Sequence, residues 1–195
     1  MGLKTHRIWL ALPVLLVGIS ASFMAPAGLA AVPENDPPSF QGRQFPFTIL
    51  KPNDPAPATP IYTLRGGVTT LKRFSGKVIL LNLWATWCPA CVHELPTLGK
   101  LQTQTGGETF SVVTLALDQD AVVSSYLKRL GVQNLPTYLD PAGRILKPLQ
   151  MGNALPLSVL IDHRGRVMGY MKGAADWTSI EARALIDYYI GHISP

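Results

Sequence analysis

Apolar and polar residues alternate in blocks along the middle of the chain, and these blocks predict its elements. A largely apolar run, KVILLNLWA at residues 77–85, in which only Lys77 and Asn82 are polar, indicates a strand buried on both faces of a sheet. A second such run, FSVVTLAL, lies at residues 110–117. Helical spacing predicts helices over 88–105 and over 118–131, and Gly131 ends the second. This alternation predicts parallel strand pairing with right-handed crossovers.

The last third of the chain shows a different order. LSVLID at residues 157–162 and RVMGYMKG at residues 166–173 flank a short turn with a glycine, which predicts a β-hairpin. A helix is expected over 178–191, with Thr178 as its N-cap and Glu181 completing a capping box. The chain is therefore predicted to be an α/β protein with a parallel start and an antiparallel finish.

The N-terminus carries a long apolar segment. Residues 8–33 hold no charge and follow Lys4 and Arg7, and about 20 apolar residues suffice to cross a bilayer. Residues 1–31 are therefore interpreted as a signal anchor or, because small residues surround Ala30, as a cleavable signal peptide. Either would export the rest of the chain, to the periplasmic side of a bacterial inner membrane or to the soluble periplasm, where disulfides form.

Proline is frequent from residue 32 to residue 60, which predicts a linker or an arm that follows a sheet edge. A simple spacer is the plainer of these two interpretations. Folded patterning is expected to begin near Ile61, so the domain is predicted over residues 61–195.

Charge excludes one class of partner. The net charge is +5, from 17 basic and 12 acidic residues, and the basic residues are scattered rather than clustered. Nucleic-acid binding needs a basic stripe or patch, so no nucleic-acid partner is expected.

Both cysteines of the chain, Cys88 and Cys91, lie in one four-residue window. Cys88 falls where a buried strand ends and a helix begins, and there free N–H groups and the helix dipole stabilise a thiolate. Pro89 suits the first helical position because its missing N–H would have no partner there. Cys91, one turn inside, can close a small disulfide ring. This geometry is therefore expected to give an exposed nucleophile, Cys88, and a shielded resolving thiol, Cys91.

Other uses of the pair fit less well. Haem attachment requires histidine directly after the second cysteine, but Val92 occupies that position. Structural zinc normally takes four ligands, and no second cysteine or histidine pair exists. A bridge over so short a loop restrains little of the unfolded chain. Redox chemistry is the favoured interpretation, with no metal site expected.

Several motifs then resemble the thioredoxin superfamily, and within it the TlpA/ResA/CcmG-like membrane-tethered thiol–disulfide oxidoreductases. They are GKVILLNLWATWCPAC, the pattern CxxCxxExP that ends at Pro96, LPLSVLIDHRGRVMGYMKG and ADWTSIEARALI. KGAADW is most similar to the TlpA branch. The resemblance implies a thioredoxin-like fold: a central mixed sheet flanked by helices, with an N-terminal extension and a central αβ insertion.

The resemblance also implies roles for single residues. Cys88 would attack and Cys91 would resolve, so the only redox group would be their disulfide and no further cofactor is expected. Trp84 and Trp87 would pack beside that disulfide. Pro96 would kink the active-site helix.

A cis-proline is implied opposite the disulfide, where it would contact the substrate backbone. Pro136 and Pro156 both follow a leucine, but only Pro156 leads directly into a hairpin and a terminal helix. Pro156 is therefore expected to be the cis-proline, and Pro136 to open a strand of the insertion. Together with Leu155, Trp87 and Pro89, Pro156 forms the expected substrate-binding surface.

Two positions depart from relatives of this kind. Asn82 stands where thioredoxin has a buried aspartate, and it cannot carry a proton. Glu94, three residues after Cys91, is therefore the candidate to tune or deprotonate the resolving thiol, with an exposed helix-face acid as the alternative. Pro89 follows the first cysteine, whereas this branch places proline before the second. Because the intervening dipeptide affects thiolate stability, the direction of electron flow stays open.

Three functions are consistent with these residues. The first is a reductase of client disulfides, for which the resemblance implies a membrane electron donor of the CcdA/DsbD kind. Its implied clients are apocytochrome c or copper-centre assembly proteins. The second is the same scaffold acting as an oxidant. The third is a Cu(I) chaperone that uses both cysteines and the distant His163, since soft thiolates suit Cu(I).

Overall fold

The computed structural model describes residues 1–2 and 36–193, and within the described residues one compact unit begins at Pro37. Its centre is an eight-stranded sheet with the order β1-β8-β7-β4-β5-β6-β2-β3. The strands are β1 (Thr48–Ile49), β2 (Ile61–Thr63), β3 (Val68–Thr69), β4 (Val78–Trp84), β5 (Phe110–Ala116), β6 (Thr137–Leu139), β7 (Leu157–Ile161) and β8 (Val167–Lys172).

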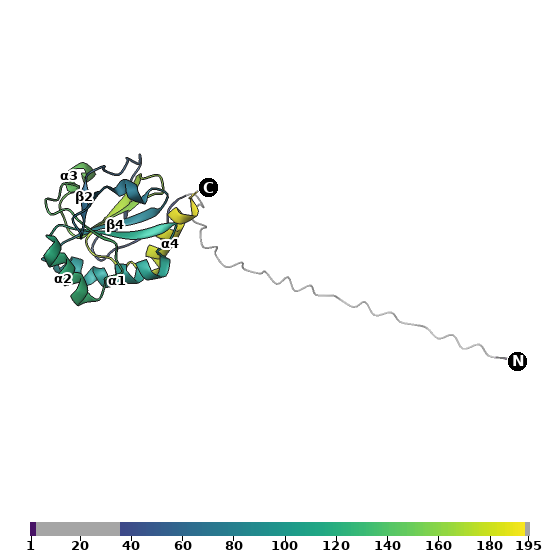
Figure 1. Ribbon diagram of the computed structural model, residues 1–195. Coiled ribbons are helices and arrows are strands. Elements are labelled where there is room, and N and C mark those ends of the chain that lie inside the picture. Colours follow the sequence, from purple (N-terminus) through teal and green to yellow (C-terminus); the bar gives the residue numbers. More distant parts are fainter. Residues whose placement is uncertain (3–35, 194–195) are drawn as a thin grey trace. The chain divides into compact units, whose positions relative to one another are not determined.

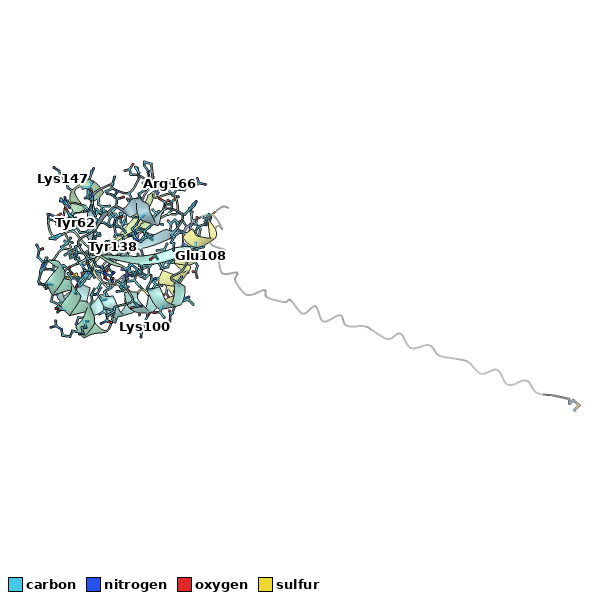
Figure 2. All side chains as sticks on the ribbon, in the orientation of Figure 1. Tyr62, Lys100, Glu108, Tyr138, Lys147 and Arg166 are labelled. Carbon is cyan, nitrogen blue, oxygen red and sulfur yellow. A yellow bond between two sulfur atoms is a disulfide. The ribbon has the colours of Figure 1, made fainter. Side chains whose placement is uncertain are left out.

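Helices cover both faces of this sheet. They are the short 3₁₀ helix η1 (Leu71–Phe74) and the α-helices α1 (Pro89–Thr105), α2 (Asp120–Leu130), α3 (Leu146–Leu149) and α4 (Ile180–Gly191). Buried residues of α1, α2 and α4 share one core cluster, while those of η1 and α3 share the other. Figure 1 shows α1 and α2 on one side of the sheet and α3 on the other. Side chains fill the space between these layers (Figure 2).

The strand directions confirm the predicted parallel start and antiparallel finish. β4 and β5 pair in parallel, as do β5 and β6, whereas β7 is antiparallel to both β4 and β8. All seven residues of β4 are buried, because alternate side chains enter the two opposite cores. Pro136 directly precedes β6, which lies with α2 and α3 in the insertion between β5 and β7, as expected.

The proline-rich segment before Ile61 is part of the fold rather than a spacer. β1 pairs with the edge strand β8, and the side chains of Phe40 and Phe47 are buried in the core. The start of folded structure expected at Ile61 is therefore too late by more than 20 residues, since the compact unit begins at Pro37. The reason is that the two phenylalanines are isolated among prolines and polar residues, so no periodic pattern reveals their burial.

The last helix begins one residue later than predicted. Ser179, not Thr178, is the N-cap of α4, and its hydroxyl accepts a hydrogen bond from the N–H of Ala182 at 3.2 Å. The Thr178 hydroxyl instead donates to Asp176 Oδ1 at 2.6 Å. The loop before the helix thus uses Thr178, and the expected capping box with Glu181 does not form.

Apart from residues 1–2, the expected signal segment lies outside the described residues. Within residues 1–2 and 36–193, none of the helices is both long and apolar enough to span a bilayer.

Candidate active site

The two cysteines form a disulfide at the point where β4 gives way to α1. The chain turns after Trp84, with the N–H of Cys88 donating to the carbonyl of Ala85 at 3.1 Å, and Cys88 becomes the N-cap of α1. Pro89 occupies the first turn, as expected. Cys88 and Cys91 are joined with a Cα–Cα distance of 5.3 Å. The main-chain N–H of Cys91 also points to Cys88 Sγ at 3.2 Å.

The two cysteines differ in their access to solvent. Cys88 is 7% exposed and Cys91 is 1% exposed. A helix N-terminus stabilises negative charge, and the Cys91 N–H would donate to a thiolate on Cys88. Cys88 therefore combines the greater access with the better-stabilised anion, and Cys91 lies behind it.

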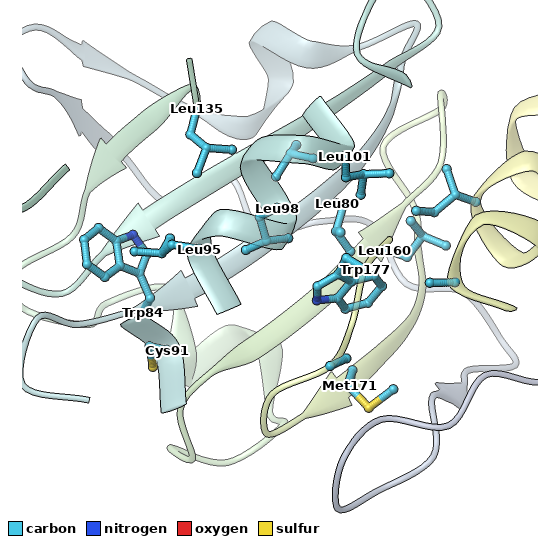
Figure 3. Packing of buried hydrophobic residues seen from close by; sticks show 14 of the residues in the cluster. Leu80, Trp84, Cys91, Leu95, Leu98, Leu101, Leu135, Leu160, Met171 and Trp177 are labelled. Carbon is cyan, nitrogen blue, oxygen red and sulfur yellow. The ribbon is translucent and has the colours of Figure 1, made fainter. Parts of the chain in front are cut away.

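Two tryptophans flank the pair in different ways. Trp84 is fully buried and belongs to the same core cluster as both cysteines; Figure 3 shows it near Cys91, with Trp177 farther along the cluster. Trp87 is 67% exposed, so its ring is presented to solvent rather than packed in the core. An exposed indole directly before Cys88 is an apolar surface next to the disulfide.

The bond between Leu155 and Pro156 is cis, as the sequence predicted, whereas the described cis bonds do not include the one before Pro136. Pro156 directly precedes β7, whose Leu157 pairs with Leu83 of β4. The strand register therefore carries Pro156 to the end of β4 from which the chain turns toward Cys88.

Glu94 is buried within α1, and the alternative of an exposed helix-face acid is wrong. Its side chain is 2% exposed. Oε1 accepts hydrogen bonds from the Trp177 indole N–H at 2.6 Å and from the Ala175 N–H at 3.1 Å. Oε2 accepts one from Asn82 Nδ2 at 3.0 Å. Three donors thus fix a carboxylate one helical turn beyond Cys91.

Opposing effects decide the charge of Glu94. Burial disfavours the carboxylate and raises the pKa of Glu94 from 4.5 to about 7. The hydrogen bonds from Trp177, Ala175 and Asn82 oppose that rise, as does the positive charge of Arg43. Glu94 can therefore take up and release a proton near neutral pH, as a general base must.

Asn82 links Glu94 to the neighbouring strand. Its amide group donates to Glu94 Oε2 and also to Ser158 Oγ at 2.9 Å, while its own oxygen Oδ1 is buried without a partner. A half-turn of the amide would present Oδ1 to Glu94, which could then donate once it is protonated. Asn82 can therefore donate to the Glu94 carboxylate in one orientation and accept from the protonated carboxyl group in the other.

The sequence did not assign a role to Trp177, although its motif KGAADW contributed to the resemblance. Trp177 is fully buried and makes the shortest hydrogen bond to Glu94. The only signal was a tryptophan directly before a helix, which does not reveal a contact with a residue 83 positions earlier.

Glu94 also borders a pocket of about 300 Å³. The pocket is lined by Arg43 of the N-terminal segment, by α1 residues on either side of Glu94, and by the loop after β8. His93 and Asp176 contribute its other ionisable groups. The buried carboxyl group is therefore next to a space that charged, exposed side chains surround.

The structure does not bring His163 to the cysteines. His163 lies in the turn between β7 and β8, beyond the far end of β7 from Pro156. In the part of the chain that the structure describes, no group of three or more His, Cys, Asp or Glu side chains could hold a metal ion. The pair formed by Cys88 and Cys91 therefore gains no third ligand of these types there.

Comparison with known proteins identifies this arrangement. The model of the Redoxin family matches residues 51–186, which include the cysteine pair, Glu94, Pro156 and Trp177. The chain belongs to the Redoxin family. Its relatives include the thiol-disulfide oxidoreductase ResA of Bacillus thuringiensis subsp. konkukian (strain 97-27), which is 30% identical over 141 residues, or 72% of this chain and 77% of that protein. ResA of Bacillus subtilis (strain 168) is 26% identical over 141 residues, or 72% of this chain and 74% of that protein.

Comparison with solved structures agrees with this assignment. The chain is similar to a putative thiol:disulfide interchange protein DsbE from Chlorobium tepidum, with a TM-score of 0.62 and 25% identity over 74% of this chain and 99% of that one. StoA from Bacillus subtilis has the same fold, with a TM-score of 0.54 and 23% identity over 69% and 98% of the two chains. The protein thus has the thioredoxin-like fold that the motifs implied, and it is a thiol–disulfide oxidoreductase.

Proposed function

We propose that the protein reduces disulfides of client proteins on the periplasmic side of a bacterial inner membrane. The observation that carries this proposal is the unequal pair at the start of α1: Cys88 is the more accessible and the better placed to be a thiolate, and Cys91 is almost fully buried. Thiol–disulfide exchange in either direction needs this asymmetry, because one thiol must meet the client and the other must be kept from it. The CxxCxxExP context and the expected N-terminal tether are the features that favour reduction.

The reaction has two exchanges. The Cys88 thiolate attacks one sulfur of the client disulfide, forms a mixed disulfide and releases the other client sulfur as a thiolate. Cys91 then loses its proton and attacks Cys88 Sγ, which closes the Cys88–Cys91 disulfide and releases the second client thiolate. The client gains two electrons and the protein loses two. The exposed rings of Trp87 and Pro89 and the half-buried side chain of Leu155 form the surface on which the client segment would lie. The ring of the cis-proline Pro156 is buried, so this residue would meet the client through its backbone.

Glu94 is the base proposed for the second exchange. It lies three residues after Cys91 on the same helix, so both side chains project from one face of α1. Its pKa of about 7 lets it accept a proton from Cys91 at neutral pH and return it to solvent. Asn82, at the position where thioredoxin has an aspartate, positions the carboxyl group but cannot take its proton.

The proposed place and partners follow from the N-terminal sequence and from the chemistry. Residues 8–33 carry no charge and follow two basic residues, which favours export with or without an anchor. A reductase in an oxidising space needs external electrons, and a membrane donor of the CcdA/DsbD kind would supply them. Apocytochrome c or copper-centre assembly proteins, whose cysteines must be reduced before they bind haem or copper, are the proposed clients.

The opposite direction has one observation in its favour. The N-cap position of Cys88 and the N–H of Cys91 both stabilise the Cys88 thiolate, and a more stable thiolate makes the disulfide a stronger oxidant. The equilibrium reduction potential against glutathione or dithiothreitol separates the two functions. A value near that of thioredoxin, about −270 mV, supports the reductase, and a value near about −120 mV would replace it with the oxidant.

Trapping tests the roles of the two cysteines. Cys91→Ser is expected to accumulate mixed disulfides with clients, because the first exchange proceeds and the second cannot. Cys88→Ser is its matched control and should accumulate few. If only Cys88→Ser accumulates them, the assignment of attacking and resolving thiol is reversed.

A further inference from the structure

The N-terminal segment before Ile61 contacts the hydrogen-bond network of Glu94. The ring of Phe40 lies 5.1 Å from the ring of Trp177, the residue that donates to Glu94 Oε1. Phe40 is 4% exposed, and its carbonyl accepts the N–H of Phe47 at 2.8 Å. Residues 40–47 therefore form a packed loop against one side of the active-site network.

The same loop fixes Arg43 beside the pocket of Glu94. The main-chain N–H of Arg43 donates to the carbonyl of Ala174 at 3.0 Å, and the N–H of Gly42 donates to the carbonyl of Phe45 at the same distance. These bonds hold the backbone of Arg43 against the loop after β8. Its side chain is exposed and lines the pocket that Glu94 borders.

The ionisable groups at this pocket come from three segments. Arg43 belongs to the N-terminal loop, His93 to α1 and Asp176 to the loop after β8. Hydrogen bonds from Thr178 lower the pKa of Asp176, and Arg43 lowers it further, so this carboxylate is charged at neutral pH. The partners that β4 and β7 present to the network, Asn82 and Ser158, do not titrate.

We propose that Arg43 is a positioning residue for the resolving step: it favours the carboxylate form of Glu94, and the pocket that it lines is the route by which the proton of Glu94 reaches solvent. The inference rests on the proposed role of Glu94 as the base for Cys91. It assigns a part in the reaction to the N-terminal arm, outside the strands and helices that carry the cysteines.

The proton balance of the step follows. Cys91 gives its proton to the Glu94 carboxylate, the Cys91 thiolate attacks the mixed disulfide at Cys88, and the former partner leaves as a thiolate. Protonated Glu94 then loses the proton to water in the pocket. Arg43 exchanges no proton, and its positive charge makes both the resting carboxylate and this release more favourable.

The charge of Arg43 opposes the effect of burial on Glu94, so its removal must raise the pKa of Glu94 above about 7. One exposed charge is expected to shift it by about 0.5 pH unit. The carboxylate fraction would then fall about threefold at pH 6 and about twofold at pH 7, and would not change at pH 9.

The test uses the full reduced chain in detergent and an aromatic disulfide, 5,5′-dithiobis(2-nitrobenzoate). The first coloured thiolate is released when Cys88 attacks, and the second when Cys91 resolves the mixed disulfide. Arg43→Gln should slow the second phase about threefold at pH 6 but not at pH 9, and should leave the first phase unchanged. Arg43→Lys keeps the charge and should restore the profile. Arg65→Gln, in the turn between β2 and β3, is the matched control.

The outcomes separate this inference from the proposed function. A second phase in Arg43→Gln that matches Arg65→Gln at every pH overturns the role of Arg43, as does a slowing that Arg43→Lys fails to rescue. If Glu94→Gln leaves the second phase unchanged, the base itself is wrong. A first phase that is as fast in Cys88→Ser as in the unaltered protein would instead contradict Cys88 as the nucleophile.

Discussion

Replacement of Glu94 by glutamine should reveal how much the buried carboxyl group costs the fold. Above pH 4.5 the unfolded chain loses the Glu94 proton, but the folded protein keeps it until about pH 7. Between these values the folded state binds more protons, so the stability falls as the pH rises. The cost is nearly absent below pH 4.5 and complete above pH 7. A shift from 4.5 to about 7 corresponds to about 3 kcal/mol.

The glutamine variant keeps most of the contacts. Its oxygen can accept from Trp177 and Ala175, as Glu94 Oε1 does. Its NH₂ group would face the amide nitrogen of Asn82, but a half-turn of Asn82 presents Oδ1, which has no partner in the native structure. That half-turn moves the NH₂ group of Asn82 away from Ser158 Oγ, to the site where Oδ1 has no partner. The neutral side chain therefore removes the ionisation cost, and the unpaired amide adds a cost that does not depend on pH.

The assay is urea unfolding of the oxidised protein at several pH values from 4.5 to 8.5. The stability of the native protein relative to Glu94→Gln should fall by about 3 kcal/mol across this range, with most of the fall below pH 7. Glu181→Gln, at an exposed site in the first turn of α4, is the control and should follow the native curve. Parallel curves for native protein and Glu94→Gln, within about 1 kcal/mol, would refute a raised pKa at Glu94.

Further substitutions test the arm, the sheet edge and the client surface. Phe40→Ala should lose about 3 kcal/mol in urea unfolding because it empties a core site, whereas exposed Phe45→Ala should change little. Gly169→Ala should cost about 1–3 kcal/mol, because its Cβ would clash with the carbonyl oxygen of Thr48 in β1. Gly107→Ala, whose Cβ would have nothing within 4 Å, should be nearly neutral. Trp87→Ala should slow reduction of a protein disulfide but not of dithiobisnitrobenzoate, with an unchanged melting temperature; equal slowing with both substrates contradicts a client-contact role.

Neighbouring residues were sufficient to predict the cysteine site, because the buried strand and the reactive residues follow each other directly in the sequence. The run that became β4 is apolar at both alternate and intervening positions except Asn82, and it is rich in strand formers, so it indicated a strand buried on both faces. Cys88, Pro89 and Cys91 follow it directly, and the end of a strand and the start of a helix are local events. The sequence alone therefore predicted the redox pair, its unequal members and the order of strands and helices around it.

The proline at position 156 needed more than local information. Pro136 and Pro156 both follow a leucine, so the residue before each proline did not separate them. The choice of Pro156 came from the order of elements after it, and the structure confirms it.

By itself, the sequence determined the fold class, the cysteine pair, the parallel start of the sheet and the hairpin near its end, because periodicity and helix-start signals depend on neighbouring residues. Only the tertiary structure decided the state of Glu94, which depends on donors from Asn82 and Trp177, 12 and 83 positions away. It also decided that the proline-rich arm belongs to the domain and brings Arg43 to that carboxyl group. Burial and charge depend on what surrounds a side chain in space, and its neighbours in space were far away in the sequence.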